Sequence, residues 1–314
     1  MKIFDSTTIH QKYKRSAIAI GNFDGVHKGH QKIIRECVKV AKKKKLYSIV
    51  LTFEPHPKEY FNKQYKPFKL TSITSKIDEI KKLNINYFIT LKFNNSLNHL
   101  SPENFIKNIL IKNLKAKNIV VGYNFRFGYK RKGNVKLLKN LAKKYDYNLN
   151  IVKPVITKDG KICNSTLIRK NLQFGKYEKV KEMLGRSWQI NGKVIKGTGR
   201  GDNIGYPTAN MKLKDYIIPC KGVYVTESYF KESKNKKKYL GIANIGNRPT
   251  FGDKEIFFEN HFFNIKNKTL YGKNICTNLI SFLRKEKKFF NINELKKQIK
   301  VDINLAKKIL NKKK

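Results

Sequence analysis

The sequence predicts two domains: an N-terminal α/β domain with a Rossmann-like parallel sheet, and a C-terminal small antiparallel β-barrel with a terminal helix. In the first half of the chain, short apolar runs alternate with amphipathic stretches, which is the pattern of strands and helices in a parallel α/β sheet. After residue 188, strand-like runs follow one another with no helix between them, which is typical of a barrel. This change in pattern places the domain boundary between residues 185 and 186 of the 314.

The composition supports two folded domains and makes a nucleic-acid-binding protein the weaker hypothesis. Hydrophobic residues make up 40% of the chain, which is enough for ordinary cores. A net charge of +47 would attract nucleic acid or acidic membranes. The lysines, however, are spread along the whole chain and accompany no nucleic-acid-binding motif, which indicates a lysine-rich compositional bias. We therefore expect no specific nucleic-acid partner.

Membrane association, disulfide bonds and zinc sites are not expected either. No apolar run is long enough to span a membrane, and the N-terminus turns polar at once instead of forming a signal peptide. The four cysteines lie far apart and form no CxxC pair, which fits a reducing cytoplasm. We expect a cytoplasmic protein that is a monomer or a weak oligomer.

The segment Gly21–His30 is the first candidate binding site. It follows the apolar run 17–20, which indicates a buried strand, and it precedes a helix expected from Gln31 to Lys45. A strand, a glycine-rich turn and a helix start direct backbone N–H groups and the positive end of the helix dipole at the turn. His27 and His30 add side-chain donors at the same place. The segment therefore predicts an anion site, with a nucleotide phosphate as its natural ligand.

The rest of the first half completes the α/β pattern. Strands are expected at 47–53, 87–91, 118–121 and 149–155, and helices at 75–83 and from Ser101-Pro102 onward. Ligands of such sheets bind beyond the carboxyl ends of the strands, near the switch in strand order. The turn at Gly21–His30 comes at the end of the first expected strand, in agreement with this rule.

A second candidate, Gly122–Gly128, comes directly off the fourth expected strand. Phe125 and Phe127 are suited to stacking on a flat ring, and Asn124 offers both a hydrogen-bond donor and an acceptor. In the alternative interpretation, both Phe side chains belong to the core and Arg126 lies in solvent.

A third candidate opens a helix that is expected to start near Asn164 and run to about Gly175. Hydroxyl groups such as those of Ser165 and Thr166 are usually caps at such a position. With Arg169 one turn later, they form a second anion-binding helix start. This Ser-Thr-Leu-Ile-Arg start, together with the His-x-Gly-His turn, resembles the nucleotidyltransferases of the HxGH superfamily. The resemblance implies that both groups hold a nucleoside triphosphate and stabilise charge on its α-phosphate while pyrophosphate leaves.

The second half of the chain combines expected strands with a glycine-rich loop. Strands are expected at 189–196, 222–230, 239–245, 255–265 and 274–283, and a final helix contains Leu295, Ile299, Ile303, Ala306 and Leu310. The loop Gly197–Gly205 allows backbone N–H groups to approach phosphate oxygens, although it is not a Walker A loop. A flexible hairpin tip is the alternative. Thr208 and Asn210 follow with oxygen atoms that suit Mg²⁺, whose shell is completed by water and substrate phosphates.

Glu259 and His261 share one face of the strand expected at 255–265. An unpaired carboxylate is costly inside a barrel, so the first interpretation of Glu259 is a functional one, as the general base for a hydroxyl group. The alternative is a solvated glutamate on an edge strand.

Several long motifs resemble, in the same order, those of the bacterial bifunctional riboflavin kinase/FAD synthetase family. The first half contains GNFDGVHKGH, FEPHP and NFRFG. The second half contains GTGRGDNIGYPTAN, GIANIGNRPTF, ENH, LYG and FLRKEKKF. The resemblance covers nearly the whole chain. It implies an FMN adenylyltransferase (FAD synthetase) domain at residues 1–185 and a riboflavin kinase domain at residues 186–314.

The resemblance implies two reactions that use ATP, Mg²⁺ and a flavin. Riboflavin would be phosphorylated at its 5′-hydroxyl to give FMN, and AMP would then pass from ATP to FMN to give FAD and pyrophosphate. The implied catalytic residues are Glu259, His27, His30 and Arg169. The implied ATP- and phosphate-binding residues are Gly21, Phe23, Asp24, His27, His30, Ser165, Thr166, Arg169, Gly197, Gly199, Gly205, Thr208 and Asn210. The implied flavin-binding residues are Asn124, Phe125, Phe127, Arg284 and Glu286, and the implied metal ligands are Thr208 and Asn210.

The sequence departs from the family pattern at three places. Asn164 stands where Ser is usual, Asn134 where an acidic residue is expected, and Ser187-Trp188 where Pro-Tyr is usual. Since the amide of Asn164 still donates a hydrogen bond, we expect an altered phosphate contact there rather than its loss. The nearest alternative is a kinase with a weakened adenylyltransferase half. A basic nucleic-acid-binding protein is an alternative of a different class.

Overall fold

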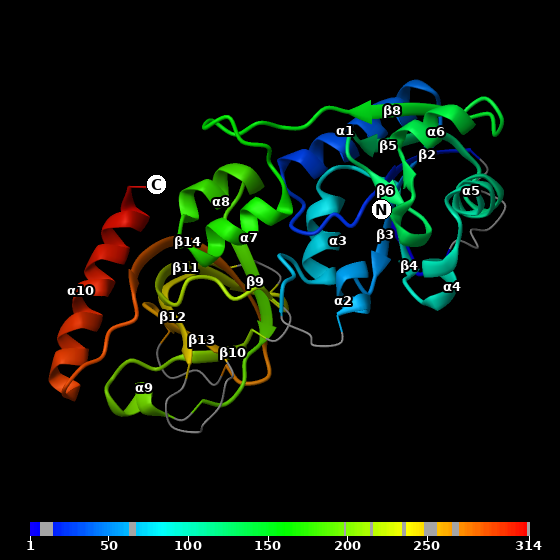
Figure 1. Cartoon of the computed structure of the whole chain (residues 1–314). Helices are drawn as coiled ribbons and strands as arrows, with labels where there is room; N and C mark the ends of the chain where they lie inside the picture. The colour runs from blue at the N-terminus through cyan, green and yellow to red at the C-terminus, as the bar shows by residue number, and fades with distance from the viewer. Residues whose placement is uncertain are drawn as a thin grey trace. The chain divides into compact units, whose positions relative to one another are not determined.

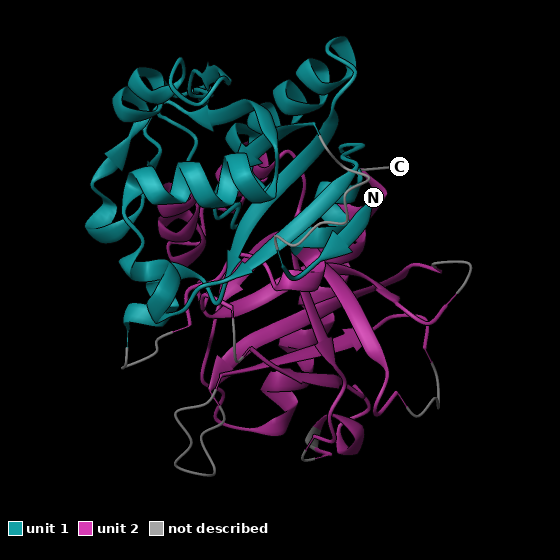
Figure 2. Cartoon of the chain, turned by 90° about the vertical axis from the view of Figure 1, so that its right-hand side faces the viewer, with its two compact units in different colours: residues 1–66, 76–164 teal, residues 67–75, 165–314 magenta. Residues whose placement is uncertain are grey.

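The computed structural model describes most of the chain as two compact units. The described residues are 1–6, 15–62, 67–197, 199–213, 216–233, 237–247, 256–265 and 270–312, except for the side chain of Arg200. Residues 1–66 and 76–164 form the first unit, and residues 67–75 and 165–314 form the second (Figure 2). The predicted features at Thr198, at residue 255 and at 248–251 lie outside the described residues.

The first unit is built on a parallel sheet, as predicted. Its strands are β1 (Lys2–Phe4), β2 (Ser16–Ile20), β3 (Tyr47–Glu54), β4 (Tyr87–Lys92), β5 (Ala116–Gly122) and β8 (Asn148–Val152). They lie in the order β1-β4-β3-β2-β5-β8, and every neighbouring pair is parallel (Figure 1). β2 is buried along its whole length, as expected for a central parallel strand with both faces covered.

Helices alternate with these strands. The helices of the first half are α1 (Lys28–Lys43), α2 (Pro57–Phe61), α3 (Ile73–Lys81), α4 (Asn95–His99), α5 (Pro102–Asn104) and α6 (Val135–Leu141). α5 continues into a π-helical segment, Phe105–Asn113, and a 3₁₀ turn covers Tyr129–Arg131. The short strands β6 (Arg126–Phe127) and β7 (Gly133–Asn134) pair with each other after β5. As predicted, Ser101 caps α5 and Pro follows at its first position.

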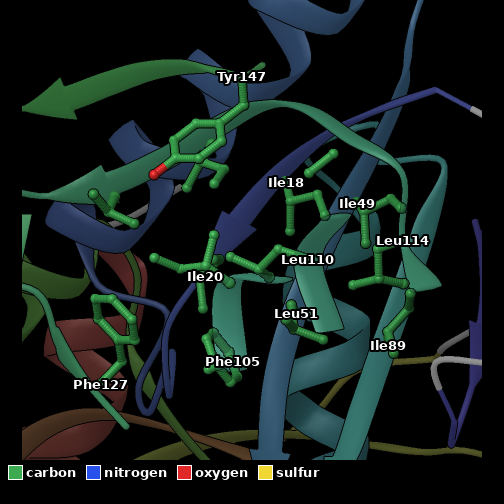
Figure 3. Packing of buried hydrophobic residues seen from close by; sticks show 14 of the residues in the cluster. Ile18, Ile20, Ile49, Leu51, Ile89, Phe105, Leu110, Leu114, Phe127 and Tyr147 are labelled. Atoms are coloured by element: carbon green, nitrogen blue, oxygen red, sulfur yellow. The ribbon is translucent and has the colours of Figure 1, made fainter. Parts of the chain in front are cut away.

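The core of the first unit holds β2 between two helical layers. On one face, side chains of β2, β3 and β4 pack against Leu110 of the π-helical segment and Leu114 directly after it (Figure 3). On the other face, α1 buries Ile34 and Cys37. Burial raises the pKa of the Cys37 thiol to about 12, so this cysteine is a core residue and not a reactive thiol. Packing on both sides fixes the position of the turn that follows β2.

Two features of the first unit differ from the sequence-based expectation. The first helix begins at Lys28 rather than at Gln31, because the side chain of His27 caps it. The edge strand β1, which pairs with β4, is not predicted. It has only three residues, and a periodic pattern cannot be recognised over so short a run.

The second unit contains the predicted antiparallel barrel. Its strands are β9 (Trp188–Lys193), β10 (Ala209–Lys212), β11 (Gly222–Phe230), β12 (Tyr239–Asn247), β13 (Ile256–Phe262) and β14 (Asn274–Lys285). They lie in the order β10-β13-β12-β11-β14-β9, with every neighbouring pair antiparallel. The N–H of Ile195 donates to the carbonyl of Asn210 at 2.9 Å, which joins the two edges. The sheet is therefore a nearly closed barrel.

The inner face of the barrel is fully buried and contains a polar network. On β13 the inward residues Phe258 and Asn260 are 0% exposed. The Asn260 amide accepts a hydrogen bond from Thr226 Oγ1 at 2.9 Å and donates one to Ser228 Oγ at 3.0 Å. Because each buried polar group has a partner, the network holds β13 and β11 in one register without a desolvation penalty.

The outer face of the barrel is covered in part by α10 (Ile292–Asn311), which lies along β11, β12 and β14 (Figure 1). Val223, Val225 and Ile242 of the sheet pack against the helix in one apolar cluster. Ala306 of α10 lies at the centre of this cluster and is 0% exposed. The predicted terminal helix thus borders the exposed part of the outer face of the barrel.

The other helices of the second unit are α7 (Ser165–Gln173), α8 (Tyr177–Leu184) and α9 (Arg200–Asn203). The hydroxyl of Tyr177 accepts from the N–H of Trp188 at 3.0 Å and donates to its carbonyl at 3.2 Å, which fixes α8 to the start of β9. Among the described residues, no helix has the length and apolar character needed to cross a membrane.

The segment 67–75 belongs to the second unit although it comes from the first half of the sequence. Trp188 Nε1 donates to the carbonyl of Leu70 at 2.7 Å, and the amide of Asn191 donates to Ser75 Oγ at 2.6 Å. β9 therefore holds this segment at two points. The compact units divide at residues 164 and 165, whereas the boundary predicted between residues 185 and 186 concerns the two activities and stays a prediction.

Two short elements of the second unit are not predicted. The helical turn α9 lies inside the glycine-rich loop, where no helix is expected, and it begins after Gly199, whose φ is +76°. β10 is a strand of four residues that contains Asn210. Both elements are too short to show a period in the sequence.

Candidate active sites

The first candidate site is the turn between β2 and α1. The chain runs β2-β3-β4 toward one edge of the sheet and then crosses to β5 on the other side of β2. The switch in strand order therefore lies between β2 and β5. The turn 21–27 and the segment 122–128 follow these two neighbouring strands at their carboxyl ends, which is where ligands of such sheets bind.

His27 has a structural role as well as a predicted functional one. Its Nδ1 accepts a hydrogen bond from the N–H of His30 at 3.3 Å, which makes it the N-cap of α1. Because Nδ1 accepts, a neutral ring carries its proton on Nε2. The two imidazole rings stack with centroids 3.6 Å apart. The helix start thus fixes the tautomer of His27 and the orientation of both rings.

The glycine between the two histidines lies in a tightly packed position. A Cβ at Gly29 would lie 3.0 Å from Cε1 of His27 and 3.4 Å from the carbonyl oxygen of Cys163. A side chain would therefore require the His27 ring to shift. The His-x-Gly-His spacing is explained by this contact, which the sequence alone does not reveal.

The rest of the turn is held in an unfavourable backbone conformation. Phe23 and Val26 have φ of 49° and 40°, in the left-handed region that bulky and β-branched residues rarely adopt. Both side chains are buried, and the ring of Phe23 contacts His30 edge-on at 5.3 Å. Of the other residues predicted here, Asp24 is buried, and Gly21 packs against the Phe23 ring. The turn is a preorganised structure in which Phe23 supports His30.

The predicted flavin-binding residues in the segment after β5 differ in their exposure to solvent. Asn124 is exposed, Phe125 is half-buried and Phe127 is buried. Phe127 belongs to the core cluster (Figure 3). Its ring centroid lies 5.6 Å from that of Phe105, and its ring stacks on that of Phe125 with centroids 5.4 Å apart. For Phe127 the position favours the alternative interpretation of a core residue, and Arg126 is exposed as that interpretation requires.

Two residues of this unit that depart from the family pattern, Asn134 and Asn164, make local hydrogen bonds. Asn134 is the N-cap of α6, because its Oδ1 accepts from the N–H of Leu137 at 2.9 Å. An acidic residue would cap in the same way, so the substitution keeps the fold and removes only a negative charge. The amide of Asn164 donates to the carbonyl of Ile162 at 3.0 Å.

The predicted second anion site lies at the start of α7, in the second unit. Ser165 is half-buried and Thr166 is exposed in its first turn. Arg169 donates through Nε to the carbonyl of Phe68 at 2.8 Å, and its guanidinium lies over the Phe68 ring at 5.3 Å. The segment 67–75 therefore orients Arg169, a role for Phe68 that the sequence does not indicate. His27 and His30, in contrast, belong to the first unit.

A cavity of about 400 Å³ on the outer face of the barrel is the second candidate site. The site residues predicted from the sequence that line it are Gly197, Gly199, Thr208, Asn210, Glu259, Arg284 and Glu286, together with His261 on the same face as Glu259. Gly205 is predicted but does not line it; Ile204 and Tyr206 do. Residues separated by almost ninety positions in the sequence, from Gly197 to Glu286, thus meet in one cavity.

Strand register places five lining residues in one row across the sheet. Asn210 of β10 pairs with Glu259 of β13, which also pairs with Asn244 of β12. Asn244 pairs with Val223 of β11, and Val223 pairs with Arg284 of β14. Neighbouring strands are about 4.8 Å apart, so Glu259 and Arg284, three strands apart, are separated by about 14 Å along the sheet. The row runs from an amide, past a carboxylate, to a guanidinium.

Glu259 and His261 share a face, as predicted, but it is the outer face of the barrel. The alternate residues Phe258 and Asn260 occupy the interior. Glu259 is half-buried and lines the cavity, so the reason for its carboxylate is not burial inside the barrel. His261 Nδ1 lies 2.9 Å from the carbonyl oxygen of Pro207. Since a carbonyl only accepts, this Nδ1 carries a proton and ties β13 to the segment before Thr208.

Asn210 is buried and its orientation depends on a glycine. Its Nδ2 donates to the carbonyl of Thr208 at 3.1 Å. A Cβ at Gly197 would lie 2.3 Å from this Nδ2, a distance that no side chain could tolerate. Gly197 therefore makes room for the Asn210 amide, which is a more specific role than loop flexibility.

Arg284, on β14, and Glu286, directly after this strand, also line the cavity. The guanidinium of Arg284 is paired with the carboxylate of Asp302 on α10, with NH2 to Oδ2 at 2.7 Å. The carboxylate of Glu286 lies against Gly246, where a Cβ would meet its Oε1 at 1.7 Å. Asp302, Asn244 and Tyr206 also line the cavity but are not predicted as site residues. Tyr206 and Asn244 lie within the motifs GTGRGDNIGYPTAN and GIANIGNRPTF, and the register of Asn244 with Glu259 places it in the row.

The described part of the chain contains no group of three or more His, Cys, Asp or Glu side chains arranged to hold a metal ion. The oxygen donors at Thr208 and Asn210 are neutral, with the Glu259 carboxylate on the neighbouring strand. Such a set fits Mg²⁺, which binds few protein oxygens and keeps water and phosphate ligands. It does not fit a zinc site, which needs three or four nitrogen or sulfur ligands.

Comparisons with known proteins give a family for each half of the chain. Residues 9–166 match the family model for FAD synthetase, and residues 184–310 match the model for riboflavin kinase. A bifunctional riboflavin kinase/FMN adenylyltransferase of Buchnera aphidicola (from Schizaphis graminum) is 41% identical over 94% of both chains. The Bacillus subtilis protein of the same name is 36% identical over 94% of this chain and 92% of its own.

A solved structure described as a macrolide-efflux protein from Streptococcus pneumoniae has the same fold. Its TM-score is 0.82 at 30% identity, over 93% of this chain and 94% of the other. The two family models and the identity to curated relatives over nearly the whole length together show that this chain belongs to the bifunctional riboflavin kinase/FMN adenylyltransferase family.

Proposed function

We propose that the protein makes FAD from riboflavin in two steps: ATP-dependent phosphorylation of riboflavin to FMN, and transfer of AMP from a second ATP to FMN. Family membership supports both steps. The observation that carries the first step is the row Asn210–Glu259–Asn244–Val223–Arg284 in the barrel cavity. Along this row, Asn210 would lie near the phosphates of ATP and Glu259 would act as the base. Asn244, Val223 and Arg284 would contact the rest of an extended ligand.

In the kinase step Glu259 is the general base. Its carboxylate takes the proton of the riboflavin 5′-hydroxyl as that oxygen attacks the γ-phosphorus of ATP, and ADP leaves. The backbone N–H groups of Gly197 and Gly199 in the glycine-rich loop approach the phosphates, and Gly205 is proposed to allow the loop its turn. The half-buried position of Glu259 in the cavity supports this role.

Thr208 and Asn210 are proposed to hold Mg²⁺ through their side-chain oxygens. When bound, the ion neutralises negative charge on the phosphates of ATP. The amide of Asn210 donates through Nδ2 to the Thr208 carbonyl, so Oδ1 is the atom that suits a metal. Asn210 is directly beside Glu259 in the row, so the phosphate end and the base are one strand apart.

The row also gives the direction in which riboflavin lies. With the 5′-hydroxyl at Glu259 and the phosphates at Asn210, the ribityl chain and the ring extend the other way, over Asn244 and Val223. The ring then reaches Arg284, about 14 Å from Glu259 along the sheet. Arg284 and Glu286 are therefore proposed as flavin-binding residues, and both line the cavity.

In the adenylyltransferase step an FMN phosphate oxygen attacks the α-phosphorus of ATP and pyrophosphate leaves. His27 and His30 are proposed to stabilise charge on the phosphates, with His27 donating through Nε2. The backbone of Gly21, Phe23 and Asp24 is proposed to add phosphate contacts in the first unit, and Ser165, Thr166 and Arg169 are proposed to bind phosphate in the second unit. Asn124 and Phe125 are proposed to contact the flavin, whereas the buried ring of Phe127 supports Phe125.

The finer assignments are part of the same proposal. The adenylyltransferase domain is assigned to residues 1–185 and the kinase domain to 186–314. We propose a cytoplasmic enzyme that is a monomer or weak oligomer, without a specific nucleic-acid partner. The wide distribution of lysines along the chain supports the last point.

A turnover assay tests the proposal. Purified protein with riboflavin, ATP and Mg²⁺ is expected to accumulate FMN first and FAD after a lag, as followed by chromatography. A parallel assay started from FMN measures the second step alone. FMN without FAD in both assays would support the alternative of a weakened adenylyltransferase half. If neither product forms, the proposal is wrong.

A further inference from the structure

The buried carboxylate of Asp302 is paired with the guanidinium of Arg284. Arg284 donates from Nε to both carboxylate oxygens at 3.0 Å and from NH2 to Oδ2 at 2.7 Å. Asp302 is only 1% exposed and also accepts from the amide of Gln298 at 2.9 Å. Both members of the ion pair line the cavity of the barrel. The pair therefore joins α10 to the fifth residue of the cross-strand row.

The contacts of Arg284 fix the plane of its guanidinium. Besides the pair with Asp302, NH1 donates to the carbonyl of Lys285 at 3.0 Å, and the group lies 5.9 Å from the Phe289 ring centroid. Among the described residues these bonds use three of the five N–H groups of the side chain. One N–H on each terminal nitrogen is left for a ligand, and both nitrogens have fixed positions.

We propose that Asp302 is a positioning residue of the kinase site: it holds the Arg284 guanidinium beside the ring of the flavin. Through this contact α10 contributes to flavin binding. This inference rests on the proposed function. It assigns a role to a residue 43 positions after Glu259 that does not itself touch the reacting atoms. A planar guanidinium held from behind by a bidentate carboxylate is preorganised for hydrogen bonds to the carbonyl edge of a flat ring.

A purely structural role is the competing interpretation, in which the pair only fastens α10 to the barrel. Buried ion pairs contribute little net stability, because desolvation offsets the attraction, so fastening alone is a weak reason for one here. The apolar cluster around Ala306 and Ile303 already attaches the same helix to the same strands. The two interpretations differ in what happens to riboflavin binding when the helix is loosened without changing the pair.

The test is the riboflavin KM of an Asp302→Asn variant of the full chain. We expect KM to rise about tenfold and kcat to change less than about twofold, because a binding contact distant from the phosphoryl group is weakened. Ile303→Ala is the matched control: it removes apolar contact from the same helix and leaves the ion pair intact, so KM is expected to stay unchanged. Melting temperatures of both variants check that they are loosened to a similar degree.

A double-mutant cycle identifies the group through which Asp302 acts. In an Arg284→Ala background, Asp302→Asn is expected to leave KM where Arg284→Ala alone has put it. Additive increases in KM, or an equal increase in Ile303→Ala, would overturn the proposal. If Asp302→Asn does not fold, Gln298→Met removes one bond to the carboxylate at similar volume. Its KM is then expected to rise about twofold, and an unchanged KM would overturn the proposal.

The wild-type assay separates this inference from the proposed function. If the wild-type chain makes no FMN, the proposed function fails. If it makes FMN and the KM values show none of the expected pattern, only the role of Asp302 fails. FAD formation from supplied FMN is expected to be the same in all of these variants and serves as an internal control.

Discussion

The two candidate sites are assembled in opposite ways. The histidine turn of the first unit comes from one continuous segment, 21–30, held at the end of a buried parallel strand. The cavity of the second unit takes single residues from five strands, and only the register of the barrel brings them into one row. The first site depends on local backbone geometry and the second on long-range pairing.

This difference determines which changes each site tolerates. In the turn, neighbouring residues support one another, as Gly29 and Phe23 do for the two histidines. In the row, support comes from distant elements: Gly197 makes room for Asn210, and α10 holds Arg284 through Asp302. Substitutions should therefore affect one reaction at a time, and the predictions below test that separation.

The largest effect is expected from Glu259→Gln. Loss of the base should lower FMN formation about 10²- to 10⁴-fold, the usual contribution of general base catalysis. FAD formation from supplied FMN should not change. Glu227→Gln, on the same sheet in a pair with Lys238, is the control and should leave both rates unchanged. Equal loss of both reactions in a folded Glu259→Gln variant would contradict a site in the barrel alone.

His30→Ala is expected to have a slightly smaller effect, on the other reaction. Removing one donor to the developing phosphate charge should lower FAD formation from FMN about 10²- to 10³-fold, with FMN formation unchanged. His99→Ala removes an exposed histidine of the same unit that stacks on Tyr129, and it should change neither rate. A normal rate of FAD formation in His30→Ala would remove the histidine turn from the mechanism.

Gly197→Ala tests whether the amide of Asn210 is held for a metal. The added methyl group displaces that amide, so the Mg²⁺ concentration that half-saturates FMN formation should rise about 10- to 100-fold, the usual cost of disturbing a group around a metal ligand. In an Asn210→Ser background the same substitution should add nothing, because the clashing group is gone. An unchanged Mg²⁺ dependence of Gly197→Ala would count against metal binding at Asn210.

The smallest effect concerns how α8 is attached to the barrel. Burial raises the pKa of Tyr177 well above its ordinary value near 10. The unfolded chain therefore loses this proton first, and the stability that the buried hydroxyl contributes is present below pH 10 and lost as the pH rises further. Tyr177→Phe should lower the melting temperature by about 4–8 °C at pH 8, because it removes both hydrogen bonds to Trp188, each worth about 1 kcal/mol.

At alkaline pH that difference should become smaller. Above pH 10 the wild-type chain is destabilised by ionisation of the unfolded tyrosine, whereas the phenylalanine variant is not. Tyr123→Phe, at an exposed position of the first unit, should show no such change between pH 8 and pH 11. A difference for Tyr177→Phe that stays constant over this range would show that the hydroxyl is not buried as described.

Much of the fold was predictable from the sequence, because long apolar runs carry it. The parallel sheet and the barrel follow from strand-like runs such as 17–20, 47–53 and 222–230, and the last helix follows from a helical period. The start of α1 was placed three residues late, because the helix is capped by an imidazole, which is not among the usual N-cap residues. The strands β1 and β10 are too short to be recognised.

The candidate sites were predictable to different degrees for the same reason that they differ in construction. The turn at His27 and His30 is contiguous, so a motif reveals it. For Glu259 the motif predicted the residue but not the face of the barrel on which its side chain lies. That face depends on which of the alternating residues of the strand fill the barrel interior. Asp302 carries no motif, because its role comes from a contact with a strand that lies far away in the sequence. Phe127 shows the reverse: a motif residue whose ring belongs to the core.

Mixing two inactive variants tests the separation of the sites most directly. Glu259→Gln and His30→Ala are each given riboflavin, ATP and Mg²⁺, alone and together, and FAD is measured. Alone, the first should make almost no FMN and the second should stop at FMN. Together they should make FAD, because FMN released by His30→Ala is the substrate of the intact adenylyltransferase in Glu259→Gln. Absence of FAD from a mixture of two folded variants would contradict two independent sites that share only a diffusible intermediate.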